Sequence, residues 1–157
     1  MSELFMREVT RENWRTALQL GVTPEQQHFV AGVEPVVALA LAKAYIRPAG
    51  LQWIPYVFFA DSNMVGFAEL AYELGSISNY WLFHFFIDQQ FQGRGYGKKA
   101  LQLFLHQIRE QHSNCQIFQL TVHPENHRAQ HLYESAGFRL AGTEIEGELL
   151  YQLKMYE

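Results

Sequence analysis

Three alternating glycines, Gly93, Gly95 and Gly97, stand between an aromatic segment and an amphipathic one, and this limits how the chain can fold. Residues 80–88 are rich in aromatic side chains and predict a strand. Residues 93–112 carry apolar side chains at helical spacing and predict a helix. The glycines therefore belong to a turn that leads from a strand into the N-terminus of a helix.

A turn of this kind is suited to binding a phosphate or pyrophosphate. Glycines allow the backbone N–H groups to approach one anion, and the positive end of the helix adds to the attraction. Lys98 and Lys99 supply full positive charges. The segment is neither a Walker loop, G-x-x-x-x-G-K-[ST], nor the Rossmann fingerprint, G-x-G-x-x-G. The alternative is a glycine-rich helix entry with solvated lysines.

The rest of the chain predicts an alternation of strands and helices. Hairpins, such as the one around the turn at residues 61–63, require antiparallel pairing, whereas strand–helix–strand units favour parallel pairing. Thr10 and Asn126 are suitable N-caps. The fold class is therefore α/β (α+β), with a mixed sheet and helices on both faces. Strands are expected at residues 4–9, 53–60, 64–73, 80–88, 116–122, 138–143 and 149–156, and helices at 10–20, 24–44 in pieces, 93–112 and 126–136.

Composition narrows the class of protein further. The 157 residues, 48% of them hydrophobic, suit one domain over residues 1–157, and the net charge of −4 argues against nucleic-acid binding. No segment approaches 18 uninterrupted apolar residues, so we expect no membrane span. Cys115 is the only cysteine, which favours a cytoplasmic setting. His123, His127 and His131 recur every four residues but lack a carboxylate or cysteine partner, so we expect no metal.

Two motifs resemble those of one enzyme superfamily. Gln92-x-x-Gly95-x-Gly97 is similar to the pyrophosphate-binding motif of the GNAT N-acetyltransferases, (Gln/Arg)-x-x-Gly-x-(Gly/Ala). Residues 126–138 are similar to a second element of that family, Asn-x-x-Ala-x-x-(Leu/Phe)-Tyr-x-x-x-Gly-Phe. Both stand in the family's order and spacing. The resemblance implies a three-layer domain whose mixed central sheet has about six to seven strands.

The resemblance also implies a binding site for acetyl-CoA. Backbone amides from Gln92 to Lys98 would hold the pyrophosphate, and the backbone of one strand would align the pantetheine arm. Asn126 would hydrogen-bond that arm, and Tyr133 would be the general acid that protonates the leaving sulfur. A packed core aromatic is the alternative for Tyr133. The residues implied to contact acetyl-CoA are Phe85, Phe86, Ile87, Gln92, Gly93, Arg94, Gly95, Tyr96, Gly97, Lys98 and Asn126.

The acceptor side is less constrained. Residues 81–88 resemble the matching strand of diamine and polyamine acetyltransferases, which often carry a carboxylate before the paired phenylalanines, whereas this chain has Phe83 and His84 there. His84 is a candidate general base, with a partly buried, hydrogen-bonded histidine as the alternative. Glu69 and Glu73 are candidates for attracting an ammonium ion, with a solvated strand face as the alternative.

The sequence thus predicts an N-acetyltransferase that transfers acetyl directly, in a ternary complex, to a primary amine of a small molecule. A polyamine or diamine such as spermidine or spermine is the favoured acceptor. The alternatives are another amine (an aminoglycoside-like antibiotic, an amino acid or a protein N-terminus) and a non-catalytic acyl-CoA-binding module. The aromatic C-terminal strand, with Tyr151 and Tyr156, allows a homodimer.

Overall fold

The computed structural model describes residues 3–156, which form one seven-stranded sheet flanked by helices. The strands follow the order β1-β2-β3-β4-β5-β7-β6, and every neighbouring pair is antiparallel except β4 and β5. The strands are β1 (Leu4–Glu8), β2 (Gln52–Ala60), β3 (Asn63–Tyr72), β4 (Tyr80–Ile87), β5 (Ile117–Val122), β6 (Arg139–Ile145) and β7 (Glu148–Lys154). The helices are α1 (Trp14–Ala17), α2 (Pro24–Val30), α3 (Val36–Ile46), α4 (Tyr96–Gln111) and α5 (His127–Ser135), with 3₁₀ turns η1 (Pro48–Gly50) and η2 (Gln89–Phe91).

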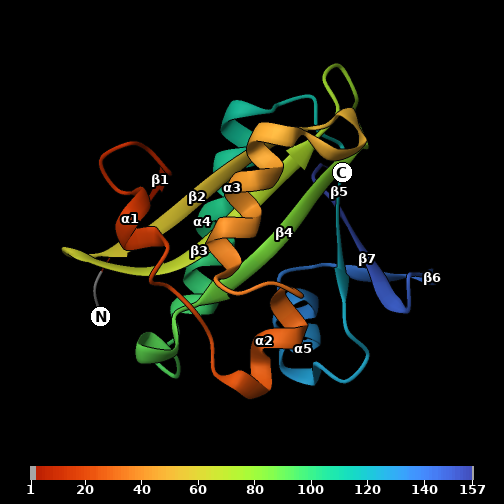
Figure 1. Ribbon diagram of the computed structural model, residues 1–157. Helices are drawn as coiled ribbons and strands as arrows, with labels where there is room; N and C mark the ends of the chain where they lie inside the picture. Colours follow the sequence, from red (N-terminus) through yellow and green to blue (C-terminus); the bar gives the residue numbers. More distant parts are fainter. Residues whose placement is uncertain (1–2, 157) are drawn as a thin grey trace.

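Helices cover both faces of the sheet, which makes three layers (Figure 1). On one face, α1 and α3 pack against the central strands, and Val37 and Ala40 of α3 are buried with Val57 and Phe67. Alternate side chains of the same strands point to the other face, where α4 and α5 lie. The mixed sheet with helices on both faces confirms the predicted fold class.

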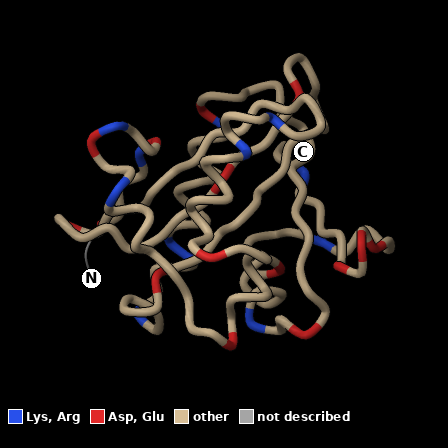
Figure 2. The backbone as a smooth tube through the Cα atoms, in the orientation of Figure 1, with Lys and Arg blue, Asp and Glu red and all other residues tan. Residues whose placement is uncertain are grey.

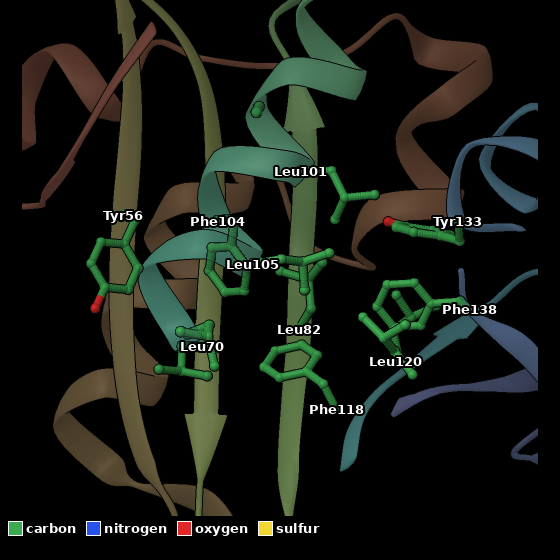
Figure 3. Close-up of a cluster of buried hydrophobic side chains, with 14 of the residues drawn as sticks. Tyr56, Leu70, Leu82, Leu101, Phe104, Leu105, Phe118, Leu120, Tyr133 and Phe138 are labelled. Carbon is green, nitrogen blue, oxygen red and sulfur yellow. The ribbon is translucent and has the colours of Figure 1, made fainter. Parts of the chain in front are cut away.

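The larger core lies between the sheet and α4. Phe104 and Leu105 of α4 pack with Leu70 and Leu82 of the sheet, and Phe118 of β5 completes the cluster (Figure 3). These leucines and phenylalanines are buried because α4 places one apolar stripe toward the strands. This packing fixes the N-terminus of α4 relative to the end of β4.

The sheet opens between β4 and β5. These two strands pair only at Trp81 and Gln119, and beyond that pair they diverge toward α2 and α5 (Figure 1). On its other edge, β4 stays paired with β3 as far as Ile87. The last residues of β4 therefore have one edge that β5 does not cover.

A β-bulge bends β4 just before this opening. Opposite β3, the register shifts between Phe67 and Glu69, and His84 adopts a left-handed φ of 56°. Directly after the bulge, β3 approaches β4 so closely that only glycine fits at Gly66. A Cβ atom at this position would lie 2.8 Å from the carbonyl oxygen of Phe86.

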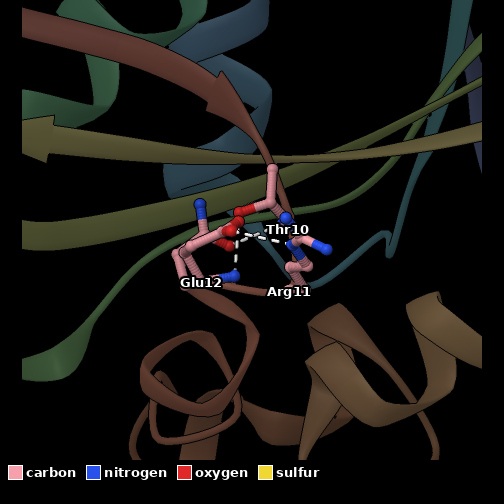
Figure 4. A network of polar contacts seen from close by, with 4 residues as sticks. Thr10, Arg11 and Glu12 are labelled. Atoms are coloured by element: carbon pink, nitrogen blue, oxygen red, sulfur yellow. Dashed lines mark hydrogen bonds and ion pairs between the residues drawn. The ribbon is translucent and has the colours of Figure 1, made fainter.

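Two helices begin later than the sequence predicts. α1 begins after Asn13, and the predicted N-cap, Thr10, instead belongs to the preceding turn (Figure 4). There, the Thr10 N–H donates to Oδ1 of Asn13 at 2.7 Å, and Oγ1 of Thr10 accepts from the N–H of Glu12 at 3.3 Å. α4 begins at Tyr96 and not at residue 93, because the glycines before it take left-handed conformations.

β6 and β7 form a hairpin at the end of the sheet, and β6 is exposed along its whole length. Charged residues of both signs are interspersed along most of the chain, but residues 144–148 at this turn carry three glutamates (Figure 2). Tyr151 is buried and donates to Oε2 of Glu134 at 2.8 Å, so only Tyr156 is available on the surface. The homodimer stays a prediction.

None of the helices within residues 3–156 combines the length and the apolar character needed to cross a membrane.

Candidate active site

A cavity of about 460 Å³ lies beside the last residues of β4. Its walls come from α2, the end of β4, the glycine turn, the start of α4 and α5 with its N-cap. Most of the residues predicted to contact acetyl-CoA line it. The lining residues are Val22, Gln26, Phe29, Val30, Phe85, Phe86, Ile87, Phe91, Gln92, Gly93, Gly95, Tyr96, Gly97, Lys98, Asn126, Arg128, Ala129, His131, Leu132 and Tyr133.

The β4 wall offers backbone groups as well as side chains. Phe85, Phe86 and Ile87 all line the cavity, and β5 does not pair with this part of β4. Free N–H and C=O groups on a strand edge can pair with an extended ligand as an added strand would. This edge therefore suits a long, flexible ligand that carries amide groups.

Two residues of the glycine turn adopt left-handed backbone conformations. Gly93 and Gly95 have φ of 77° and 81°, values that other residues adopt only with strain. Gly97 and Lys98 lie in the first turn of α4, where the helix itself offers no acceptor to the N–H groups. Arg94 is the exception among the predicted contacts, because it is exposed, stacks on Phe91 and lies outside the cavity lining.

The side chain of Gln92 ties the glycine turn to α2. Nε2 of Gln92 donates to Oε1 of Gln26 at 3.0 Å and to the carbonyl oxygen of Ile87 at 2.9 Å. Nε2 of Gln26 donates back to Oε1 of Gln92 at 3.1 Å. The two amides thus form a reciprocal pair that joins the turn, α2 and the end of β4.

Asp88 is a second anchor, and it was not among the predicted site residues. Its side chain is buried and accepts from the N–H of Gly21 at 2.8 Å and of Gln90 at 3.1 Å. These bonds hold residues 21–22 and the start of α2 against the end of β4. The cavity wall formed by Phe29 and Val30 was likewise missed, because residues 24–44 carry no motif of their own.

Asn126 caps α5 and faces the cavity. Its Oδ1 accepts from the N–H of Ala129 at 3.2 Å, which confirms the predicted N-cap. Because the oxygen is used in this way, the NH₂ group of the side chain remains for a ligand. Tyr133, two helical turns further along, lines the same cavity, as the seven-residue spacing predicts.

Tyr133 lines the cavity and is largely buried. The residue is 8% exposed, and its ring lies 5.7 Å from that of Phe138 and 6.5 Å from that of Phe85. In Figure 3 the ring lies beside Phe138, with the hydroxyl directed away from α5. Burial raises the pKa of Tyr133, so the hydroxyl stays protonated at neutral pH.

His84 lies behind the cavity wall. Nε2 lies 2.8 Å from Nζ of Lys43, and Nδ1 lies 2.9 Å from the carbonyl oxygen of Val30. Burial, and then the charge of Lys43, lowers the pKa of His84 to about 4. With both ring nitrogens engaged and the ring outside the cavity lining, this geometry does not suit a general base and fits the hydrogen-bonded alternative.

The two candidate glutamates have different surroundings. Glu69 is 0% exposed, neither of its carboxylate oxygens has a hydrogen-bond partner among the described residues, and burial raises its pKa to about 8. A solvated strand face is therefore wrong for Glu69. Glu73 is exposed beyond the end of β3, where Oε1 accepts from Asn79 at 2.9 Å. Neither residue lines the cavity.

Comparison with known proteins identifies the architecture. The sequence model of the acetyltransferase (GNAT) family matches residues 9–138, which span most of the chain. The chain belongs to the GNAT family of acetyltransferases. As in other GNAT enzymes, it depends on acetyl-CoA as the acyl donor.

Individual relatives agree with this assignment. The chain is 28% identical over 149 residues to a spermine/spermidine N(1)-acetyltransferase of Bacillus subtilis, which covers 91% of this chain and 93% of the relative. The fold is similar to that of a spermidine N-acetyltransferase from Vibrio cholerae in complex with CoA and spermine, with a TM-score of 0.74, 20% identity and coverage of 96% and 93%. It is also similar to that of AAC(6′)-Ib in complex with paromomycin and acetyl-CoA, with a TM-score of 0.76, 17% identity and coverage of 97% and 93%.

The cavity of this GNAT chain fits a phosphorylated co-substrate. Its lining includes Lys98 and Arg128 and, among the described residues, no Asp or Glu. The left-handed glycines and the N-terminus of α4 stand at one end, and the uncovered edge of β4 stands beside them. Within residues 3–156, no three His, Cys, Asp or Glu side chains gather as a metal site.

Proposed function

We propose that this acetyltransferase acetylates a primary amine of a small molecule, and that spermidine or spermine is the preferred acceptor. The observation that carries the proposal is the cavity, which brings the glycine turn, the edge of β4, Asn126 and Tyr133 to one space. The polyamine preference is supported by the Bacillus subtilis relative, whose similarity extends over nearly the whole chain.

The N–H groups of the glycine turn and of the first turn of α4 bind the pyrophosphate of acetyl-CoA, helped by the charge of Lys98. The edge of β4 at Phe85–Ile87 pairs with the amides of the pantetheine arm, and the NH₂ group of Asn126 donates to the same arm. An N–H group of β4 polarises the thioester carbonyl.

The chemical step transfers acetyl directly from sulfur to nitrogen. The amine nitrogen forms a bond to the carbonyl carbon, and the carbon–sulfur bond breaks. Tyr133 gives its hydroxyl proton to the leaving sulfur, and a proton lost by the attacking nitrogen restores the hydroxyl through solvent. Since both nitrogens of His84 are engaged, water in the cavity takes the first proton from the ammonium form of the acceptor.

A different amine is the alternative acceptor. The cavity lining contains no carboxylate among the described residues, whereas a polyamine site would be expected to present several. The preference for a polyamine thus depends on the relative and not on the charges of the cavity. An aminoglycoside or an amino acid would require fewer carboxylates than spermine does.

The experiment that tests the proposal measures release of CoA from acetyl-CoA with one acceptor at a time. The acceptors are spermidine, spermine, putrescine, paromomycin and several amino acids, with an acceptor-free reaction to subtract hydrolysis. We expect saturable turnover with spermidine or spermine, and the product should contain one new amide. Turnover confined to paromomycin or an amino acid would overturn the polyamine preference while leaving acetyl transfer intact.

A further inference from the structure

A polar cluster of Lys43, Glu69 and His84 lies on the face of the sheet that α3 covers. Its three members come from α3, β3 and β4, and they stand 26 and 15 positions apart in the sequence. Nζ of Lys43 lies 2.8 Å from Nε2 of His84 and 5.1 Å from the ring centres of both Trp53 and Phe83. The ammonium is therefore held by a ring nitrogen and two aromatic faces.

The hydrogen bonds of His84 fix which nitrogen carries the proton. An ammonium can only donate and a carbonyl oxygen can only accept. Because Lys43 donates to Nε2, the proton of the neutral ring is on Nδ1, from which it is donated to the carbonyl oxygen of Val30 at 2.9 Å. His84 is thus the neutral Nδ1–H tautomer. Its hydrogen bonds to Val30 of α2 and Lys43 of α3, which together form the clamp on the ring, hold it between the two helices.

Glu69 is the third member of the cluster and the most deeply buried. Its carboxyl group is fully buried and lacks a hydrogen-bond partner among the described residues. Glu69 stands directly opposite Phe83 in the β3–β4 ladder, next to the bulge, and the charge of Lys43 acts favourably on its ionised form. Removing Lys43 would leave Nε2 of His84 without its hydrogen-bond donor.

The cluster lies at the point where β4 turns toward the cavity. His84 has a left-handed φ of 56°, which is a costly conformation for a residue other than glycine and persists only where its surroundings enforce it. The next three residues, Phe85–Ile87, line the cavity, as does Val30. The clamp on the ring therefore holds the backbone just before the edge that faces the co-substrate.

We propose that Lys43 is a positioning residue, whose ammonium fixes the ring of His84 and thereby the bulge that presents Phe85–Ile87 to acetyl-CoA. This inference rests on the proposed function only in the assignment of the β4 edge to acetyl-CoA. Lys43 itself does not line the cavity and takes no part in the bonds that form and break.

The first test uses ¹⁵N NMR of the full chain with labelled histidine and no acetyl-CoA present. In the wild type, His84 should show a protonated Nδ1 and an unprotonated Nε2 throughout pH 6–8. Lys43→Ala should shift the Nε2 resonance, because Nε2 loses its donor, and n-propylammonium, which replaces the missing part of the side chain, should restore the wild-type shift. Lys154→Ala, an exposed lysine on β7, is the matched control and should keep the wild-type pattern. A protonated Nε2 in the wild type, or an unchanged spectrum in Lys43→Ala, would overturn the inference.

The second test links the clamp to the co-substrate through CoA binding, measured by calorimetry. We expect Lys43→Ala and Lys43→Met, which keeps the packing of the stem, to bind CoA at least tenfold more weakly. Lys43→Arg keeps a cation and a donor and should bind within a few-fold of the wild type. Wild-type affinity in Lys43→Met, with a changed His84 spectrum, would show that the clamp does not position β4.

The third test measures kcat/KM for acetyl-CoA, which we expect to fall about 100-fold in Lys43→Met, because a small misplacement of the reacting groups costs about that much. Failure of the proposed function would appear differently, as a wild type that acetylates none of the amines. In that case the NMR spectra and the CoA affinities still decide the role of Lys43, since neither measurement needs turnover.

Discussion

The two faces of β4 differ in the polar groups that they carry and in what surrounds those groups. One face, with the glycine turn and α5, places Gly93, Asn126 and Tyr133 along a cavity free of carboxylates among the described residues. The other face carries the polar cluster of Lys43, Glu69 and His84 under α3, with Glu69 fully buried. The first face offers polar groups to a cavity, whereas the second packs its polar groups beneath a helix and, as proposed above, fixes the shape of the strand. A mutation on the first face should therefore change kinetics, and one on the second should also change stability.

The largest effect is expected from Tyr133→Phe on the cavity face. If Tyr133 donates the proton to the leaving sulfur, kcat should fall about 10²–10⁴-fold. The KM for acetyl-CoA should change little, because the ring keeps its packing against Phe85 and Phe138. Steady-state kinetics with the best acceptor measures both parameters. Tyr45→Phe is the control, since Tyr45 is 86% exposed, and a kcat of Tyr133→Phe within a few-fold of the wild type would exclude the acid role.

The next effect concerns the stability of the polar cluster. Burial raises the pKa of Glu69 from 4.5 to about 8, so its stabilising contribution is complete below pH 4.5 and is lost as the pH rises through 8. The pKa of His84 is lowered from 6.5 to about 4, so its contribution is complete above pH 6.5 and is lost as the pH falls toward 4. Below pH 6.5 the contributions of Glu69 and His84 to the free energy of unfolding change in opposite directions with pH. Between pH 6.5 and 8 only the contribution of Glu69 changes, and it falls as the pH rises.

Glu69→Gln should remove this pH dependence. Over the 1.5 pH units from 6.5 to 8, the wild-type free energy of unfolding should fall by about 2 kcal/mol because of Glu69, at about 1.36 kcal/mol per unit. Urea denaturation at several pH values measures the slope, which should be nearly flat in Glu69→Gln. Glu73→Gln removes an exposed carboxylate and should keep the wild-type slope. Identical slopes in the wild type and Glu69→Gln would mean that Glu69 is not the group responsible.

A smaller effect is expected from Gly93→Ala in the glycine turn. At a φ of 77° an alanine meets no neighbouring atom within 4 Å, so the expected cost is the backbone strain alone, about 1–2 kcal/mol. If the strain is relieved by distorting the turn, CoA should bind about tenfold more weakly, as calorimetry would show. Gly142→Ala introduces the same kind of strain at a φ of 86° on β6, far from the cavity, and should leave CoA affinity unchanged. Equal affinities in both variants would argue against the turn as the phosphate site.

The cavity face could be predicted from the sequence, because its determinants are local. Gly93 and Gly95 set the turn, and the seven-residue spacing of Asn126 and Tyr133 sets one face of α5. The polar cluster could not be predicted in this way, since its contacts join residues 41 and 54 positions apart. Such pairs leave no periodic pattern. Glu69 therefore resembled a solvated strand residue, and only the packing of α3 shows that it is buried.

The smallest effect is expected from breaking the reciprocal amide pair of Gln26 and Gln92, which joins α2 to the glycine turn. Gln26→Ala removes two hydrogen bonds, of 3.0 and 3.1 Å, that tie α2 to the glycine turn. A net loss of about 1 kcal/mol is expected, so the KM for acetyl-CoA should rise about five-fold while kcat changes less. Gln152→Ala breaks a comparable amide pair with Gln119 away from the cavity and should leave KM unchanged. If Gln26→Ala instead lowers kcat and leaves KM intact, α2 positions the reacting groups and not the co-substrate. In that case α2, which contacts His84 through Val30, would act together with the polar cluster and not with the glycine turn.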